Sequence, residues 1–365
     1  MRPLAPPNIE ALKPYVPGKS PELLARQYGI ANPTKLDSNE SALGPSPRAL
    51  AAAQAALADC HRYPDQQALR QALAEFNRVQ LEQVVVGNGS NELIDLVART
   101  FCAPGDRVVY QVPAFDCYRS AAVSLDLQRV EVPLCEHVHY ELAPLLQAVE
   151  PETKLVMLGH PNNPTGGYFT EAELRRLLAK VPEDAVVVLD EAYAEFVDAP
   201  DYRSGLKLLD AHPGLIVLRT FSKAYGLAGL RVGYGVAARP ELIAYISRLR
   251  APFNVNRVAL AAAVAALTDQ AHLERHVAHV AVERRRVSGE LAALGYSVVP
   301  SQGNFLLVKV AGSGAEVAEQ LVRQGVAVRP MPAPLTEYVR VTLGRTAEND
   351  RFIAALGRDG GGGAP

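Results

Sequence analysis

The chain has 365 residues, 48% of them hydrophobic and 21% charged, and its formal net charge is −2. These values are typical of a globular protein with a large core, most simply divided into two domains. Because basic and acidic residues are spread along the chain, the charge pattern gives no support for binding to nucleic acid or to an anionic membrane.

The sequence shows no pattern typical of a targeting signal or a metal site. The N-terminal segment MRPLAPPNIEALKPYVPGKS is rich in proline and has no apolar core, so it does not fit a secretory signal. No apolar run is long enough to span a bilayer. The cysteines, at 60, 102, 117 and 135, lack CxxC spacing, and we expect buried, reduced thiols without a metal. The expected location is the cytoplasm.

The first two thirds of the chain alternate between apolar runs typical of buried strands and periodic stretches typical of helices. An arm with one short helix is expected over residues 1–35. The elements expected after it are helices at 45–60 and 66–79, a strand, glycine turn and helix within 84–101, a strand at 107–112, a helix at 115–125, a strand at 128–134, and apolar runs at 154–161, 185–193 and 215–222. This order predicts an α/β fold whose large domain, 36–250, has a mainly parallel sheet covered on both faces.

The pattern changes near residue 251. A long helical region at 257–294 is followed by a short strand, a helix, two further strands and a last helix. We therefore expect a smaller α+β C-terminal domain over 251–356, with the N-terminal arm packed on it. The tail GRDGGGGAP, 357–365, has the composition of a disordered segment.

Lys223 is the most informative residue. It is one of only eight lysines and lies in the segment TFSKAYGLAGLRVGY, with Asp190 33 residues before it and Arg231 eight residues after it. A lysine must be neutral to attack a carbonyl, and burial or a nearby cation lowers its pKa. A Schiff-base lysine with an acidic partner for a pyridinium nitrogen is how enzymes hold pyridoxal phosphate. A solvated lysine beside a glycine-rich turn is the alternative.

Three further motifs follow predicted strands, where ligands of such sheets bind. GNGSNE, at 87–92, offers a helix N-terminus to an anion, or is a plain turn capped by Ser90 or Asn91. HPNNPTGG, at 160–167, either holds the Asn163 amide against a cofactor phenolate oxygen or forms a rigid solvated loop. DEAY, at 190–193, places Asp190 at the end of an apolar strand, where a pyridinium or a structural arginine would keep it ionised.

The order NNPTG, DEAY, SK and an arginine eight residues later resembles the aspartate-aminotransferase superfamily of pyridoxal-phosphate enzymes. Over nearly its full length the chain also resembles the histidinol-phosphate aminotransferases, in PYVPGK, SNES followed by LGPSP, RYPD, GNGSNE, PFNVN, GNF and the pair VRP…VRVTLG. The resemblance implies the superfamily's fold and transfer of an amino group between histidinol phosphate and 2-oxoglutarate, by a ping-pong mechanism, in histidine biosynthesis. It also implies a homodimer whose site is shared between subunits.

The resemblance further implies roles for individual residues. Lys223 would be the Schiff-base and proton-transferring residue, with Asp190 and Tyr193 as its catalytic neighbours. The implied cofactor contacts are Asp190 at the ring nitrogen, Asn163 and Tyr193 at the ring oxygen, Phe115 on the ring face, and Ser90, Asn91, Ser222, Arg231 and the second subunit's Tyr63 at the phosphate. The implied substrate contacts are Tyr15, Asn39, Arg329 and Arg340, with Arg340 on the α-carboxylate.

Three segments depart from the commonest pattern of that family: LDSNESALG, the short loop MPAPLTEYV, and VPAFDCY, which has Phe115 where tyrosine is usual. The first two border the substrate pocket, so an aminotransferase for phenylalanine or tyrosine is the alternative. A pyridoxal-phosphate decarboxylase of a phosphorylated amino acid shares the fold, but VRP…VRVTLG favours transamination. A regulator's ligand-sensing domain would need a DNA-binding module, for which the N-terminal segment is too short.

Overall fold

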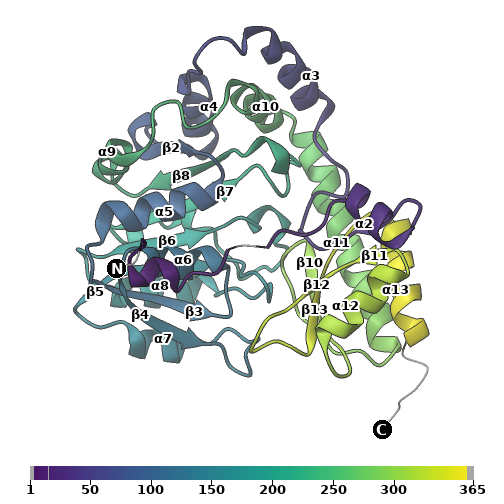
Figure 1. The fold of residues 1–365 in the computed structure, drawn as a ribbon. Coiled ribbons are helices and arrows are strands. Elements are labelled where there is room, and N and C mark those ends of the chain that lie inside the picture. The colour runs from purple at the N-terminus through teal and green to yellow at the C-terminus, as the bar shows by residue number, and fades with distance from the viewer. Residues whose placement is uncertain (1–3, 15, 360–365) are drawn as a thin grey trace.

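A seven-stranded sheet forms the centre of the larger part of the molecule (Figure 1). The computed structural model describes residues 4–14 and 16–359. The strands, in spatial order, are β2 (Val84–Gly87), β8 (Gly233–Ala237), β7 (Leu215–Thr220), β6 (Val186–Asp190), β5 (Thr153–Gly159), β3 (Arg107–Val112) and β4 (Gln128–Pro133). Only β8 runs antiparallel to its neighbours. The predicted α/β fold with a mainly parallel sheet is confirmed.

Helices cover both faces of this sheet because its central strands have no polar side. In β6, Val186 and Val188 face one hydrophobic core, and Val187 and Leu189 face another. The first core is covered by α5 (Ser90–Phe101), α6 (Asp116–Ser124) and α9 (Pro240–Leu249), and the second by α7 (Leu142–Ala148) and α8 (Glu171–Lys180). The carboxyl ends of the parallel strands therefore open at one edge of a layered structure.

The smaller part contains an antiparallel sheet and three helices. Its strands, in spatial order, are β12 (Arg329–Pro330), β13 (Tyr338–Thr342), β10 (Phe305–Lys309) and β9 (Val298–Val299). The helices are α11 (Gln270–Ala293), α12 (Gly314–Arg323) and α13 (Thr346–Asp359). A second, two-stranded sheet joins β1 (Thr34–Lys35) to β11 (Val326–Ala327). Short 3₁₀ helices occur at Leu57–Asp59, Leu81–Gln83, Ala194–Phe196, Gly205–Lys207, Leu209–Ala211 and Ala228–Leu230.

The packing of the chain after residue 251 differs from the expected domain boundary. Helix α10 (Arg257–Thr268) packs along α3 (Pro47–Ala56) and α4 (Gln67–Asn77), beside the large sheet (Figure 1). Both α3 and α10 are rich in alanine, and small side chains let two helices approach closely. The chain passes into the smaller part only along α11, so residues 251–268 belong with the large sheet.

The arm and the tail also differ from expectation. Two short helices occur in the arm, and α1 (Pro7–Glu10) lies on α6, where the Asn8 amide donates to the carbonyls of Val123 and Ser124 at 3.1 and 2.9 Å. These carbonyls at the helix end need donors from outside. Contacts with the smaller part are made later in the arm, by α2 (Pro21–Tyr28), by β1 and by the carbonyls of Val16 and Asn32. At the other terminus α13 continues through Asp359, past the buried Leu356.

Other expectations concern cysteines, metals and membranes. All four cysteines are free, but Cys60 is exposed and the other three are only half-buried, so the expectation of buried thiols is wrong. Across residues 4–14 and 16–359, no group of three or more metal-binding side chains is found. Within the same ranges, no helix combines the length and the apolar character needed to cross a membrane.

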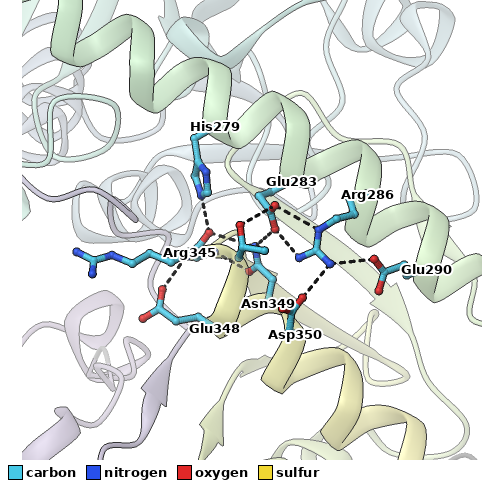
Figure 2. Close-up of polar contacts among 10 residues, drawn as sticks. His279, Glu283, Arg286, Glu290, Arg345, Glu348, Asn349 and Asp350 are labelled. Carbon is cyan, nitrogen blue, oxygen red and sulfur yellow. Dashed lines mark hydrogen bonds and ion pairs between the residues drawn. The ribbon is translucent and has the colours of Figure 1, made fainter.

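A buried carboxylate joins α13 to α11 (Figure 2). Glu283, on α11, is 3% exposed and accepts hydrogen bonds from Arg286 at 2.7 Å, from the Asn349 amide at 2.6 Å and from the Thr346 hydroxyl at 3.0 Å. Burial acts to raise the pKa of Glu283, but these hydrogen bonds outweigh it and the pKa lies below its usual value. The Asn349 amide oxygen accepts from the Gly344 N–H at 2.8 Å, so this cluster fixes the turn after β13.

We predict that Glu283→Gln lowers the free energy of unfolding by about 2 kcal/mol, because a buried ionic partner of Arg286 is lost. Glu290→Gln is the matched control: Glu290 contacts the same Arg286 at 2.8 Å but is exposed, so its loss should cost under about 0.5 kcal/mol. Urea unfolding followed by circular dichroism measures both. Because the folded pKa of Glu283 is lowered, its contribution is present above pH 4.5 and is lost as the pH falls through the folded pKa.

Candidate active site

A cavity of about 700 Å³ lies at the carboxyl ends of β5, β6 and β7. It brings together eleven of the residues expected from the sequence to form a site: Asn39, Ser90, Asn91, Phe115, Asn163, Asp190, Tyr193, Ser222, Lys223, Arg231 and Arg340. These residues come from the seven-stranded sheet and the segments that follow its strands, from β13 of the four-stranded sheet, and from the loop after β1. The cavity therefore lies where the larger and smaller parts meet.

Lys223 follows β7 and points its amine into this cavity. Its Nζ donates to the Ser38 carbonyl at 3.0 Å and lies 5.9 Å from the centre of the Tyr193 ring. Burial, and next the positive charge of Arg340, lower the pKa of Lys223 to about 7. A large fraction of this amine is therefore neutral near pH 7, as a nucleophile or a general base must be.

Asp190 ends β6 and is buried. Its carboxylate accepts from the Tyr118 hydroxyl at 3.1 Å and from the Ala192 N–H at 3.2 Å. Burial raises the pKa of Asp190 to about 6 despite these donors. In the described residues no salt bridge to Asp190 is found, so the structural arginine considered from the sequence is not seen. A cationic ligand group in the cavity would stabilise this carboxylate.

The start of α5 and the loop after β7 form a site suited to an anion. Gly89 precedes α5 with φ of 79°, and no side chain caps the helix, which rules out the simple capping role considered for Ser90 and Asn91. A Cβ at Gly89 would lie 2.6 Å from Arg231 Nη2, so a glycine is needed for the guanidinium to come this close. Arg231 Nη1 also donates to the Ser222 hydroxyl at 3.3 Å. Helix N–H groups, a hydroxyl and a guanidinium converge here.

A polar network crosses the cavity from Arg340 to Asn39. Arg340 donates to the Asn163 amide oxygen at 2.6 Å and to the Asp37 carbonyl at 2.8 Å. The Tyr193 hydroxyl accepts from the amides of Asn163 and Asn39 at 3.3 and 3.0 Å. These bonds hold Arg340, on β13, above the loop that follows β5.

Among the described residues, two expected site residues do not line the cavity. Tyr63 is 77% exposed and stacks on Phe253, with ring centres 4.4 Å apart. Arg329 lies opposite Arg340 in the β12–β13 pair and donates to the Val16 carbonyl at 3.2 Å. Tyr15 lies outside the described residues.

The sequence analysis missed three residues that hold the site. Tyr118 contacts Asp190, and its position three residues after Phe115 on one helix was an available signal. Thr342 bonds the Asn39 backbone N–H at 2.8 Å, and it lies two residues after Arg340, hence on the same strand face. Ser38 contributes only a backbone carbonyl, which no residue type reveals.

Comparison with known proteins decides the family. The family described as aminotransferase class I and II matches residues 31–356. The chain belongs to this family. It is 51% identical to the histidinol-phosphate aminotransferase of Anaeromyxobacter sp. (strain Fw109-5), covering 98% of this chain and 99% of the relative. It is 43% identical to histidinol-phosphate aminotransferase 2 of Hydrogenovibrio crunogenus, covering 96% and 95%.

Solved aminotransferases share the fold. The crystal structure of histidinol-phosphate aminotransferase from Sinorhizobium meliloti in complex with pyridoxal-5'-phosphate matches with a TM-score of 0.87 at 31% identity, covering 97% of each chain. Aspartate aminotransferase from Thermus thermophilus with maleate matches with a TM-score of 0.82 at 25% identity, covering 98% and 100%. The fold expected for this aminotransferase is thereby confirmed.

We predict that Lys223 is the most readily acetylated lysine of the cofactor-free aminotransferase at pH 7. Competitive labelling with acetic anhydride, read by peptide mass spectrometry across pH, should give it a pKa of about 7. Exposed Lys13 and Lys180 serve as internal controls and should be acetylated more slowly than Lys223 at pH 7. If Lys223 is acetylated no faster than these two lysines, the account of its burial and of Arg340 is contradicted.

Proposed function

We propose that this chain is a pyridoxal-phosphate-dependent histidinol-phosphate aminotransferase. It would transfer an amino group between histidinol phosphate and 2-oxoglutarate, a step of histidine biosynthesis, in the cytoplasmic location expected from the sequence. The observation that carries the proposal is the gathering of Lys223, Asp190 and Arg231 around one cavity. The names of the relatives at 51% and 43% identity support the choice of substrate.

The cavity fits pyridoxal phosphate in charge as well as in residue types. Asp190 supplies a buried carboxylate for the ring nitrogen, and the site formed by the start of α5, Ser222 and Arg231 supplies donors for the phosphate. Asn163 and Tyr193 line the cavity where they would contact the ring oxygen, and Phe115 would lie on the ring face. The Lys223 amine lies in the same cavity as both charged groups.

Pyridoxal phosphate, when bound, supplies an electron sink for the electrons released at the substrate's amine-bearing carbon. Lys223 Nζ, neutral at pH 7 in a substantial fraction, would take the proton from that carbon and hold it until it is returned. The carboxylate of Asp190 would stay ionised beside a cationic ring nitrogen, since an opposite charge lowers its pKa. The Tyr193 hydroxyl, held by Asn39 and Asn163, would keep its donor direction fixed.

Arg340 would bind the anionic group next to the reacting carbon: the α-carboxylate of glutamate, or the phosphate of histidinol phosphate. Its guanidinium is held by Asn163 and Asp37, and the planar fork suits either anion. Asn39 is linked to Arg340 by hydrogen bonds through the Tyr193 hydroxyl and Asn163. Arg329 and Tyr15 are the proposed contacts for the rest of the substrate, and Arg329 neighbours Arg340 across β12–β13.

We predict that histidinol phosphate and glutamate each cause loss of the visible absorbance band of the purified enzyme. Phenylalanine and tyrosine should cause this loss more slowly. Single-turnover spectra with each amino donor measure the rates. Lys223→Ala should abolish turnover, with a loss of at least about 10⁴-fold, because it removes both the attachment point and the proton carrier. A preference for phenylalanine over histidinol phosphate by more than tenfold would make the protein an aromatic aminotransferase.

We also propose that two copies of the chain form the enzyme, with Tyr63 of each completing the phosphate contacts of the other. Support comes from the 77% exposure of Tyr63, its stacking on exposed Phe253, and its absence from the residues lining its own cavity. Exposed paired aromatic rings are typical of interfaces.

We predict that Tyr63→Phe raises the Kd for pyridoxal phosphate about fivefold, the effect of losing one hydrogen bond. Tyr245→Phe, at a tyrosine that is 48% exposed and does not line the cavity, is the control and should leave that Kd unchanged. Equilibrium dialysis measures the affinity and sedimentation velocity the mass. A fully active monomer would disprove the dimer, and an unchanged Kd would disprove the role of Tyr63.

A further inference from the structure

Helix α11 carries three histidines on one face, at positions 272, 276 and 279. Each hydrogen-bonds a backbone carbonyl: His272 that of Gly44 at 3.1 Å, His276 that of Ala224 at 2.9 Å, and His279 that of Gly344 at 2.9 Å. Residues four and three apart lie on the same side of a helix. Figure 2 shows the last of these contacts, from His279 to the turn after β13. The three carbonyls belong to three different segments that carry residues of the cavity.

His276 connects two of these segments directly. Its side chain is fully buried, and Nδ1 lies 2.9 Å from the carbonyl of Ala224, the residue after Lys223. A carbonyl only accepts, so Nδ1 carries the proton and the other ring nitrogen is an acceptor. The Ser41 hydroxyl lies 3.3 Å from Nε2 and 3.4 Å from Nδ1, and because Nδ1 carries the proton, the hydroxyl can donate only to Nε2. Burial lowers the pKa of His276, which favours this neutral form.

The two connected segments also touch each other. Gly226, three residues after Lys223, has φ of 71°, and a Cβ there would lie 2.4 Å from the Gly44 carbonyl oxygen. Ser41 Oγ accepts from the Gly44 N–H at 3.1 Å. On the cavity side, Lys223 Nζ donates to the Ser38 carbonyl at 3.0 Å. His276 therefore bonds to both loops near the place where the Lys223 loop touches the loop that carries Ser38 and Asn39.

We propose that His276 is a positioning residue for Lys223. Its Nδ1–H bond to the Ala224 carbonyl fixes the backbone from which the Lys223 amine reaches the cavity, and its Nε2 joins that backbone to the Asn39 loop through Ser41. The proposal rests on the proposed role of Lys223 in transamination. His276 itself makes no contact with the cavity, so it acts only through the loop that it holds.

Two substitutions separate the ring nitrogens. The amide nitrogen of asparagine takes roughly the place of Nδ1, and that of glutamine the place of Nε2. His276→Asn therefore keeps the bond to Ala224, whereas His276→Gln loses it and keeps a contact with Ser41. Both remain polar and close to histidine in size, so both are expected to fold.

We expect His276→Gln to lower kcat about tenfold, with KM for glutamate changed less than about twofold, because the reacting amine is misplaced while the binding groups remain. In the cofactor-free chain, competitive acetylation should give Lys223 a pKa about one unit higher, since a loosened loop admits water. His276→Asn should keep both values within about twofold and about 0.3 unit of the parent enzyme.

The matched control is His212→Gln. His212 is 2% exposed and bonds the Pro182 carbonyl at 3.0 Å, but it precedes β7 and so lies at the opposite end of that strand from Lys223. The substitution His212→Gln should lower the melting temperature and leave kcat and the Lys223 pKa unchanged. The proposal is overturned if His276→Gln behaves like His212→Gln, or if His276→Asn loses as much kcat as His276→Gln. Failure of the parent enzyme to transaminate would instead refute the proposed function.

Discussion

The buried carboxylate of Asp190 is the constraint on which the rest of the site depends. It ends a strand whose other residues are all apolar, and its neighbours Tyr118 and Ala192 give it donors but no counter-charge. A carboxylate in such surroundings is costly to ionise unless a cation is supplied. The fold therefore holds a carboxylate in the cavity that favours a cationic group beside it. The proposed pyridinium nitrogen would supply that charge, and Asp190 would in turn hold it in its protonated form.

The Lys223 amine, in contrast, is acted on by neighbouring positive charges. Arg340 and Arg231 act on its amine from the substrate side and the phosphate side, and both favour its neutral form. An anionic substrate and an anionic cofactor would each reduce this positive field. The same two arginines that would bind the anions therefore also adjust the basicity of the amine, so binding and proton transfer are electrostatically linked.

Much of the large sheet could be predicted because its strands are buried on both faces. Continuous apolar runs located β3, β5, β6 and β7, and the polar residues at or just after the ends of β5, β6 and β7 located the cavity. The strand β8, GYGVA, was missed because its two glycines break any apolar run. The side of the molecule on which α10 lies was also unpredictable, since an alanine-rich helix shows no strongly apolar face that would select a partner.

The site residues also include some that one sequence reveals and others that it does not. Motifs with unusual residue types, such as Lys223 and Asn163, are visible in one sequence because their chemistry is local. Ser38 was invisible because it acts through its backbone. The roles proposed for Tyr63 and Arg329 concern residues outside the lining of the cavity in their own chain. A buried histidine such as His276 attracts no attention in a sequence, since nothing local distinguishes it from a core residue.

The N-terminal arm is fastened at both ends to different parts of the molecule. Asn8 bonds the end of α6 on the large sheet, while β1 pairs with β11 of the smaller part, and Pro17 between them lines the cavity. Because the arm between these two contacts has a fixed length, it limits how far the two parts of the molecule can separate. Because Pro17 lies between these two contacts, a change in the spacing of the two parts would also move a residue of the cavity wall.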